Sequence, residues 1–316
     1  MGIIEILTAL VKIFFLLIPG FLLKKLRIVN LEQTNGIASV ITKVTYPCLV
    51  ISAMQMEYSV QILRNCKYVF LIYTGIIIIA FLLSKVISRI VRLPAARTQL
   101  LAFMLIFGNT GFIGLPVLNG LFGSEAVFYG AICDATCDVF LFTFGLGILR
   151  ASANAKNDLK PAKKDTLKEL VNPCTIGVAI GLFLYALNIM LPEIIAQPVS
   201  LLGAATTPLA MFIVGAQLAD IKLKALISDR HIYLACFLKL FLMPAVALLL
   251  VKLVVGTGSL LATVIIMEAA MPVATVTVIF TQQFRGDIEF ATKGVLMSTL
   301  LCIATIPVVA VILSML

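Results

Sequence analysis

The sequence predicts an all-α integral membrane protein, and three bulk properties lead to this prediction. Hydrophobic residues make up 61% of the 316 positions, charged residues make up 12%, and the mean hydropathy is +1.13. Soluble domains usually carry about 25% charged residues, so this composition suits a chain whose solvent is lipid. A helix needs roughly 20 apolar residues to cross a bilayer. Ten such segments are predicted, at residues 3–23, 36–56, 68–88, 98–121, 126–149, 173–191, 197–219, 232–254, 259–281 and 290–315.

The ten segments fall into two groups of five. Residues 150–171 form the one long polar stretch, and we predict that they are a cytoplasmic linker between a first five-helix repeat at 1–149 and a second at 172–316. Because five is odd, the second group enters the membrane from the opposite side, and two related groups therefore form an inverted repeat. The first segment lacks a basic region before it, so we expect it to be retained rather than cleaved as a signal peptide.

The net charge of +9 is unevenly distributed along the chain. Seventeen Lys and Arg residues follow the first, third, fifth, seventh and ninth segments, whereas the other loops hold only Arg64, Lys67 and Lys252. Basic residues concentrate in the cytoplasmic loops of membrane proteins. The charge therefore predicts orientation rather than a nucleic-acid partner: a multi-pass protein of the plasma or inner membrane, embedded in the lipid bilayer with both termini outside the cytoplasm.

The fourth segment contains a helix-breaking element at residues 107–116, FGNTGFIGLP. Proline removes a backbone donor and clashes with the preceding turn, and glycine adds backbone entropy. The ninth segment carries Met271-Pro272 at the corresponding place when Gly123 is aligned with Gly286. Paired interruptions of this kind indicate a transporter's substrate site, and a packing kink is the alternative. The candidate substrate-binding residues here are Asn109, Thr110, Gly111, Pro116, Met271 and Pro272.

Six ionisable side chains lie inside the predicted segments: Lys12, Lys43, Asp134, Asp138, Lys239 and Glu268. Each costs about 2.5–3.5 kcal/mol at the middle of a bilayer, so each must pair, face water or lose its charge. Asp134 and Asp138 are four residues apart on one helix face, where like charges repel. This arrangement suits a proton or cation carrier, and salt bridges or solvation are the alternatives.

Glu268 and Lys239 are two further candidates for the site. Glu268 precedes Pro272 by four residues, and we consider it for contact with the substrate or with a coupling ion. Lys239 is either a substrate-binding counter-ion or the partner of an acid. His231, the one histidine, is predicted to be solvated in a cytoplasmic loop. The seven cysteines lack metal-ligand spacing, and nucleotide-binding, metalloprotease and serine-hydrolase motifs are missing, so we expect neither an enzyme nor a cofactor nor a metal site.

Several motifs resemble those of the auxin efflux carrier family. Residues 109–116 (NTGFIGLP) are similar to the family's NTGFxGLP motif. Residues 269–272 (AAMP), 286–287 (GD) and 297–300 (MSTL) resemble its second signature, and Lys239 with Pro244 resembles the basic residue and proline of its eighth helix. The resemblance covers the whole chain. The short central linker is similar to that of bacterial members, which include permeases associated with malate or malonate, rather than to that of many plant auxin exporters.

The resemblance implies a particular fold and movement. It implies ten helices in two inverted five-helix repeats, with the fourth and ninth crossing as broken helices, as in sodium/proton antiporters and bile-acid symporters. The first, second, sixth and seventh helices would form a scaffold and dimer side. The third to fifth and eighth to tenth would form a moving transport domain.

Together, these features predict a gradient-driven carrier of a small organic anion. Helix N-termini carry about +0.5 charge and free N–H groups, which suits a carboxylate bound by Asn109 and Thr110. Asp134, Asp138 or Glu268 would bind the coupling proton or sodium ion. A cation/proton antiporter that uses Asp134 and Asp138 as its site, and a channel, are the alternatives.

Overall fold

The computed structural model describes residues 3–157, 172–219 and 229–316, and these residues are almost entirely helical. Six of the seventeen basic residues counted in the predicted cytoplasmic loops lie outside the described residues. They are Lys160, Lys163, Lys164, Lys168, Lys222 and Lys224. The helical segments are, in chain order, α1 Ile3–Phe15, α2 Leu17–Lys25, α3 Leu31–Val40, η1 Ile41–Thr45, α4 Tyr46–Ala53, α5 Val60–Val91, α6 Ala95–Ile106, η2 Thr110–Gly114, α7 Leu115–Phe122, α8 Ser124–Phe140, η3 Leu141–Gly145, α9 Leu146–Asn157, α10 Pro173–Ala186, α11 Glu193–Ala204, α12 Thr206–Ala219, α14 Arg230–Phe237, η5 Leu238–Leu242, α15 Met243–Val254, α16 Leu260–Ala269, α17 Val276–Gln283 and α18 Ile288–Ser314.

The prediction of a membrane protein is confirmed at the level of its helices. Among the residues that the structure describes, seven helical stretches are long and apolar enough to cross a bilayer, and they are Ile3–Lys25, Leu31–Ala53, Val60–Val91, Ser124–Lys156, Glu193–Ala219, Arg230–Val254 and Ile288–Ser314. The remaining predicted segments appear as shorter apolar helices. The fourth and ninth are each divided into two, and the sixth is the 14-residue helix α10 rather than 173–191. The pairing of two inverted five-helix halves stays a prediction.

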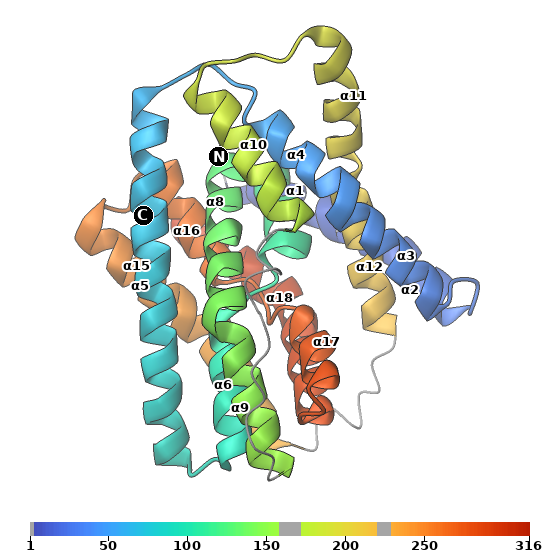
Figure 1. Ribbon diagram of the computed structural model, residues 1–316, viewed down its shortest axis with the longest axis vertical. Helices are drawn as coiled ribbons and strands as arrows, with labels where there is room; N and C mark the ends of the chain where they lie inside the picture. The colour runs from blue at the N-terminus through green and yellow to red at the C-terminus, as the bar shows by residue number, and fades with distance from the viewer. Residues whose placement is uncertain (1–2, 158–171, 220–228) are drawn as a thin grey trace.

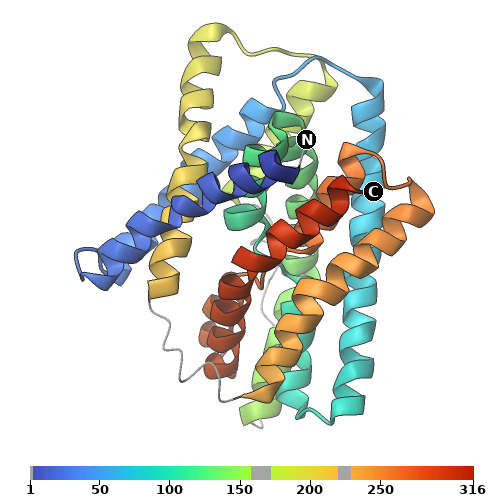
Figure 2. The ribbon, with the colours of Figure 1, turned by 180° about the vertical axis from the view of Figure 1, so that it is seen from behind.

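The helices form an elongated bundle (Figures 1 and 2). Helix α5 runs along the long axis, with α6, α8 and α15 packed against it. On the other side, α12 packs against α2 and α3, while α4 packs between α10 and α11. Helix α9 continues to Asn157, so the first residues of the predicted linker are helical.

The described part of the chain contains four single π-helical turns, η1, η2, η3 and η5, each continuous with an α-helix. In three of them a proline follows two residues after the last residue of the turn, at Pro47, Pro116 and Pro244. Proline has no N–H to donate to the carbonyl four residues earlier, and its ring crowds that carbonyl. The wider π turn relieves this crowding. As a result, α3, η1 and α4 remain one continuous 23-residue stretch despite Pro47.

Helices α2 and α12 cross in backbone contact because both carry glycine at the crossing point. A Cβ atom at Gly20 would overlap the carbonyl of Phe212, and one at Gly215 would overlap the carbonyl of Leu17. Small residues permit such close approach between helices in membranes. The crossing therefore joins the first and seventh predicted segments through direct backbone contact.

Candidate functional site

The two interrupted helices meet at their breaks. Gly108 and Val273 pair as an isolated antiparallel bridge. The backbone N–H of Asn109 donates to the carbonyl of Pro272 at 2.7 Å, and the N–H of Ala274 donates to the carbonyl of Phe107 at 3.1 Å. Both predicted interruptions are thus present, and the extended residues of one satisfy the backbone groups of the other.

The local sequence explains why the helices stop here. Proline cannot donate its nitrogen and disfavours helical geometry in the residue before it, so α16 ends just before Met271-Pro272. Gly108 lies where a side chain has little room, because a Cβ atom there would be 3.2 Å from Nζ of Lys239 and 3.5 Å from Cβ of Met271. The extended segments therefore approach each other closely at this point.

The amide groups at the crossing differ in one respect from the prediction. We expected free N–H groups at the starts of the second half-helices, but the N–H groups of Asn109 and Ala274 are occupied by the crossing itself. The N–H groups of Thr110, Gly111 and Phe112, at the start of η2, have no acceptor within residues 3–157, 172–219 and 229–316. These three donors carry the positive end of the helix dipole.

A cavity of about 320 Å³ lies at the crossing. This volume is in the range of small-molecule sites, which is about 300–1,000 Å³. Its walls come from both breaks and from η1, α4, α8, η3 and α10. The lining residues are Thr42, Lys43, Tyr46, Phe107, Gly108, Asn109, Thr110, Gly111, Phe112, Asp134, Cys137, Asp138, Leu141, Phe142, Asn172, Pro173, Cys174, Ala274, Thr275, Val276 and Phe280. Aromatic and aliphatic walls surround a small set of polar groups.

Asp134 and Asp138 both face this cavity and receive hydrogen bonds from three elements. The hydroxyls of Tyr46 and Thr110 each donate to a different oxygen of Asp134. The side-chain amide of Asn172 donates to Asp138 at 3.2 Å. Across the part of the chain that the structure describes, neither carboxylate forms an ion pair with Lys or Arg. The alternative prediction, that these two aspartates form salt bridges, is therefore not supported among the described residues.

Asn109 combines burial with an unused donor. Its side chain is 4% exposed, it lines the cavity, and its Nδ2 atom has no hydrogen-bond partner among the described residues. A buried polar group without a partner costs free energy. Asn109 therefore offers a ready donor to a molecule in the cavity.

The structure places Lys239 behind the crossing rather than in the cavity wall. Its side chain is 2% exposed, and Nζ donates to the carbonyl of Leu105 at 3.0 Å. Leu105 lies in the last turn of α6, where carbonyls form the negative end of the helix dipole. Lys239 thus stabilises the end of the first half-helix, and it forms no ion pair with an acid in the three described stretches of the chain.

Glu268 also lies outside the cavity wall. Its side chain is fully buried against Gly114 and Gly130, two positions where the missing Cβ leaves room for the carboxyl group. Both carboxyl oxygens lack a hydrogen-bond partner among the residues described. An unpartnered buried carboxylate is costly, and nothing among the described residues offsets this cost.

Three other predicted residues shape the crossing without lining the cavity. Met271 is completely buried, Pro272 contributes its carbonyl to Asn109, and Pro116 is buried in the first turn of α7. Of the ten candidates, the cavity therefore contains Asn109, Thr110, Gly111, Asp134 and Asp138.

Two of the cavity residues that donate to the aspartates, Tyr46 and Asn172, were not predicted from the sequence. Tyr46 stands before Pro47 in the second segment, and Asn172 stands before Pro173 as the N-cap of α10. The Asn-Pro pair is a signal for the start of a helix, but no local pattern shows that either side chain reaches an aspartate on α8.

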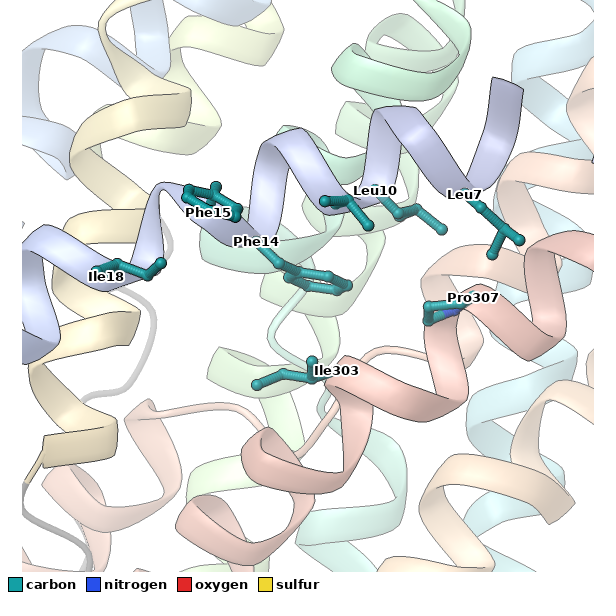
Figure 3. Close-up of a pocket in the computed structure, with 8 residues that line it drawn as sticks. Leu7, Leu10, Phe14, Phe15, Ile18, Ile303 and Pro307 are labelled. Atoms are coloured by element: carbon teal, nitrogen blue, oxygen red, sulfur yellow. The ribbon is translucent and has the colours of Figure 1, made fainter. Parts of the chain in front are cut away.

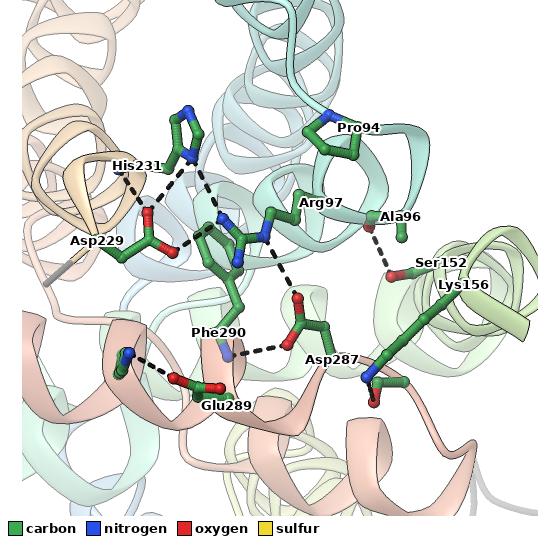
Figure 4. Close-up of polar contacts among 12 residues, drawn as sticks. Pro94, Ala96, Arg97, Ser152, Lys156, Asp229, His231, Asp287, Glu289 and Phe290 are labelled. Atoms are coloured by element: carbon green, nitrogen blue, oxygen red, sulfur yellow. Dashed lines mark hydrogen bonds and ion pairs between the residues drawn. The ribbon is translucent and has the colours of Figure 1, made fainter. Parts of the chain in front are cut away.

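The prediction for His231 was wrong. It lies in α14, its side chain is 17% exposed, and Nδ1 is 3.2 Å from Nη1 of Arg97 and 3.3 Å from Asp229 (Figure 4). Arg97 also pairs with Asp229 at 2.8 Å and with Asp287 at 3.3 Å. Because Asp229 and Asp287 cap α14 and α18, this polar cluster holds the ends of three helices together.

A second hollow, of about 280 Å³, lies between α1 and α18 (Figure 3). It is lined entirely by apolar residues, which are Leu7, Leu10, Val11, Phe14, Phe15, Ile18, Ile303 and Pro307. This groove offers no polar side chain to a charged solute. The cavity at the crossing, where the first break meets Asp134 and Asp138, is the candidate site.

Broken helices that cross at a cavity holding a few polar groups are typical of secondary membrane transporters. Residues 5–310 match the model of a family described as membrane transport protein, and the chain belongs to that family, the one that contains the auxin efflux carriers. It is 26% identical over 294 residues to an uncharacterized transporter of Methanocaldococcus jannaschii, covering 91% of this chain and 92% of that one. It is 25% identical over 307 residues to an uncharacterized transporter of Methanothermobacter thermautotrophicus, covering 96% of each.

A longer relative is the lysosomal cholesterol signaling protein of Mus musculus. The identity is 22% over 322 residues, which cover 95% of this chain and 36% of the mouse protein. The similarity therefore concerns one part of that larger protein.

Proposed function

We propose that this protein is a secondary active carrier of a small organic anion, with the solute's carboxylate bound at the start of η2. The observation that carries the proposal is the unused donor set at the cavity: Nδ2 of Asn109 and the N–H groups of Thr110, Gly111 and Phe112. Donors at a helix N-terminus are suited to anions. Lys43 adds a cation to the same lining.

The two aspartates imply coupling to a proton or a sodium ion. An anion that enters beside Asp134 and Asp138 meets two further negative charges, and this repulsion is large where water is scarce. A cation or proton bound to the pair removes the repulsion, so the anion and the positive charge travel together. The buried carboxyl of Glu268 is a second place to hold a proton.

Movement of one part of the chain against the other would carry the cavity across the membrane. In this proposal α5–α9 and α14–α18 form the moving body, and α1–α4 with α10–α12 form the scaffold through which two copies associate as a homodimer. An elevator-type movement of this kind keeps the crossing intact, which suits the mutual hydrogen bonds between residues 107–109 and 272–274. The protein would lie in the plasma or inner membrane with both termini outside the cytoplasm.

The test is uptake of labelled dicarboxylates and indole acids into proteoliposomes under imposed proton or sodium gradients. A hydrogen bond to a charged group contributes about 1.5–3 kcal/mol, so Asn109→Ala is expected to weaken solute affinity at least about tenfold. Asn65→Ala is the matched control, because Asn65 donates to the hydroxyl of Tyr129 and does not line the cavity. Equal uptake by wild type and Asn109→Ala would remove Asn109 from the site.

A cation/proton antiporter is the second candidate, because Asp134 and Asp138 face the cavity without an ion-pair partner among the described residues. Sodium or proton flux that needs no organic solute and is lost in Asp138→Asn would favour it over the anion carrier.

A further inference from the structure

Two side chains outside the predicted site connect neighbouring helices across the cavity. Tyr46 lies at the start of α4, and Asn172 caps the start of α10. Helix α4 packs directly on α10, since a Cβ atom at Gly177 would lie 2.8 Å from the Cα of Pro47. Helix α8, which carries both aspartates, packs on α5, α7 and α16 and also contacts α4 and α10. Figure 1 shows α4 and α10 together beside α8.

Asp134 accepts hydrogen bonds from both sides of the cavity. One of its oxygens accepts from the hydroxyl of Tyr46 on α4, and the other accepts from the hydroxyl of Thr110 at the start of η2. Tyr46 is 3% exposed, so its hydroxyl has little access to water as an alternative partner. Hydrogen bonds to an ionised carboxylate are about twice as strong as neutral ones.

The orientation of the Asn172 amide is fixed by its capping role. Its Oδ1 atom accepts from the N–H groups of Cys174 at 2.9 Å and Thr175 at 3.0 Å. Its Nδ2 atom is therefore directed to Asp138, at 3.2 Å. One asparagine thus caps α10 and ties that helix to α8.

We propose that Tyr46 and Asn172 form a latch that holds α8 against α4 and α10 and keeps the cavity closed. The latch opens when a proton or a solute takes over the carboxylates to which the two side chains donate. This inference rests on the proposed function, because it assigns the latch to the boundary between the moving body and the scaffold. Tyr46 and Asn172 are then positioning residues that control opening.

The alkylation rates of two native cysteines show whether the latch is open, and this measurement does not require the solute to be known. Cys137 on α8, which is buried, and Cys174 on α10, which is half-buried, both line the cavity, so opening increases the access of a reagent to their thiols. Alkylation by N-ethylmaleimide is followed at each cysteine by peptide mass spectrometry, on the full chain in lipid vesicles. Cys236 and Cys302, which are buried in α14 and α18, serve as references within the same molecule.

The latch is removed by Tyr46→Phe, which deletes only the hydroxyl, and by Asn172→Ser, which keeps a capping oxygen and deletes the donor to Asp138. The matched control is Tyr185→Phe, because the Tyr185 hydroxyl is also buried and hydrogen-bonded, but to the backbone of Ser59 away from the cavity. We expect each latch variant to raise the alkylation rates of Cys137 and Cys174 at least about threefold, with no change at the reference cysteines or in the control.

Unchanged rates at Cys137 and Cys174 in both latch variants would overturn the proposal, and so would an equal increase in Tyr185→Phe, which would indicate general loosening. If one latch variant fails to fold, the other still decides the outcome. Transport is measured separately from alkylation. If the alkylation rates change as expected but the protein moves no organic anion, the proposed function is rejected and the latch proposal stands.

Discussion

The ammonium nitrogen of Lys239 lies 3.0 Å from the carbonyl oxygen of Leu105, one residue before the end of α6. The bond joins the eighth predicted segment to the fourth at the point where the fourth is interrupted. Lys239 thereby supports the crossing from behind, while the cavity lies on the other side of the break. The sequence analysis considered Lys239 as a counter-ion for the substrate. In the structure it donates a hydrogen bond to the backbone at the break.

Lys239→Met is expected to lower the stability of the protein. The substitution keeps an apolar chain of similar length but leaves the carbonyl of Leu105 buried without its donor, at a cost of about 1–3 kcal/mol. Thermal unfolding in detergent measures the change. Lys252→Met, at the exposed end of α15, is the control and should leave the melting temperature unchanged. A more stable Lys239→Met variant would contradict the supporting role of this bond.

Gly114→Ala is expected to destabilise the protein by about 1–3 kcal/mol, which is typical of overpacking. The new Cβ atom would lie 2.7 Å from Oε1 of Glu268 and closer still to Oε2. Removing the facing carboxyl in the double variant Gly114→Ala/Glu268→Ala should recover part of this loss, and a double-mutant cycle measures the coupling. Gly147→Ala, where nothing lies within 4 Å of the new atom, is the control. Additive effects of the two substitutions would show that the glycine does not make room for Glu268.

Gly215→Ala should be more damaging than a glycine substitution at an open helix position such as Gly36. A Cβ atom there meets the backbone carbonyl of Leu17, which cannot rotate away as a side chain does. We expect separation of α2 from α12 and a lower melting temperature. Gly36→Ala has open space around it and lies within α3, so it should stabilise that helix by about 0.5–1 kcal/mol. The same response to both substitutions would contradict the close crossing.

The polar cluster around Arg97 allows the charge of Asp287 to be separated from its capping role. Asp287 accepts a hydrogen bond from the N–H of Phe290 as the N-cap of α18, and it also pairs with Arg97 (Figure 4). Asp287→Asn keeps the cap and loses the charge, so it should cost only about 0.2–1 kcal/mol, since the pair is partly exposed. Asp287→Ala loses both and should cost about 1 kcal/mol more. Equal melting temperatures for the two variants would mean that the cap contributes nothing.

Patterns along one helix predicted a large part of the candidate site. Glycine and proline restrict backbone geometry wherever they stand, so the composition of residues 107–116 and 271–272 was enough to locate both interruptions. A spacing of four residues places two side chains on one helix face, and Asp134 and Asp138 do face the same cavity. Apolar composition alone identified a membrane protein.

Contacts between distant segments were decided only by the tertiary structure. Periodicity shows that a helix has a polar face, but the packing of neighbouring helices determines what that face meets. Packing placed Lys239 and Glu268 behind the crossing and kept Asn109, Thr110 and Asp138 in the cavity wall. It also brought Tyr46 to Asp134, a residue 88 positions further along the chain. A hydrogen bond across such a separation depends on how whole helices cross, and a linear pattern of residue types carries no information about that geometry.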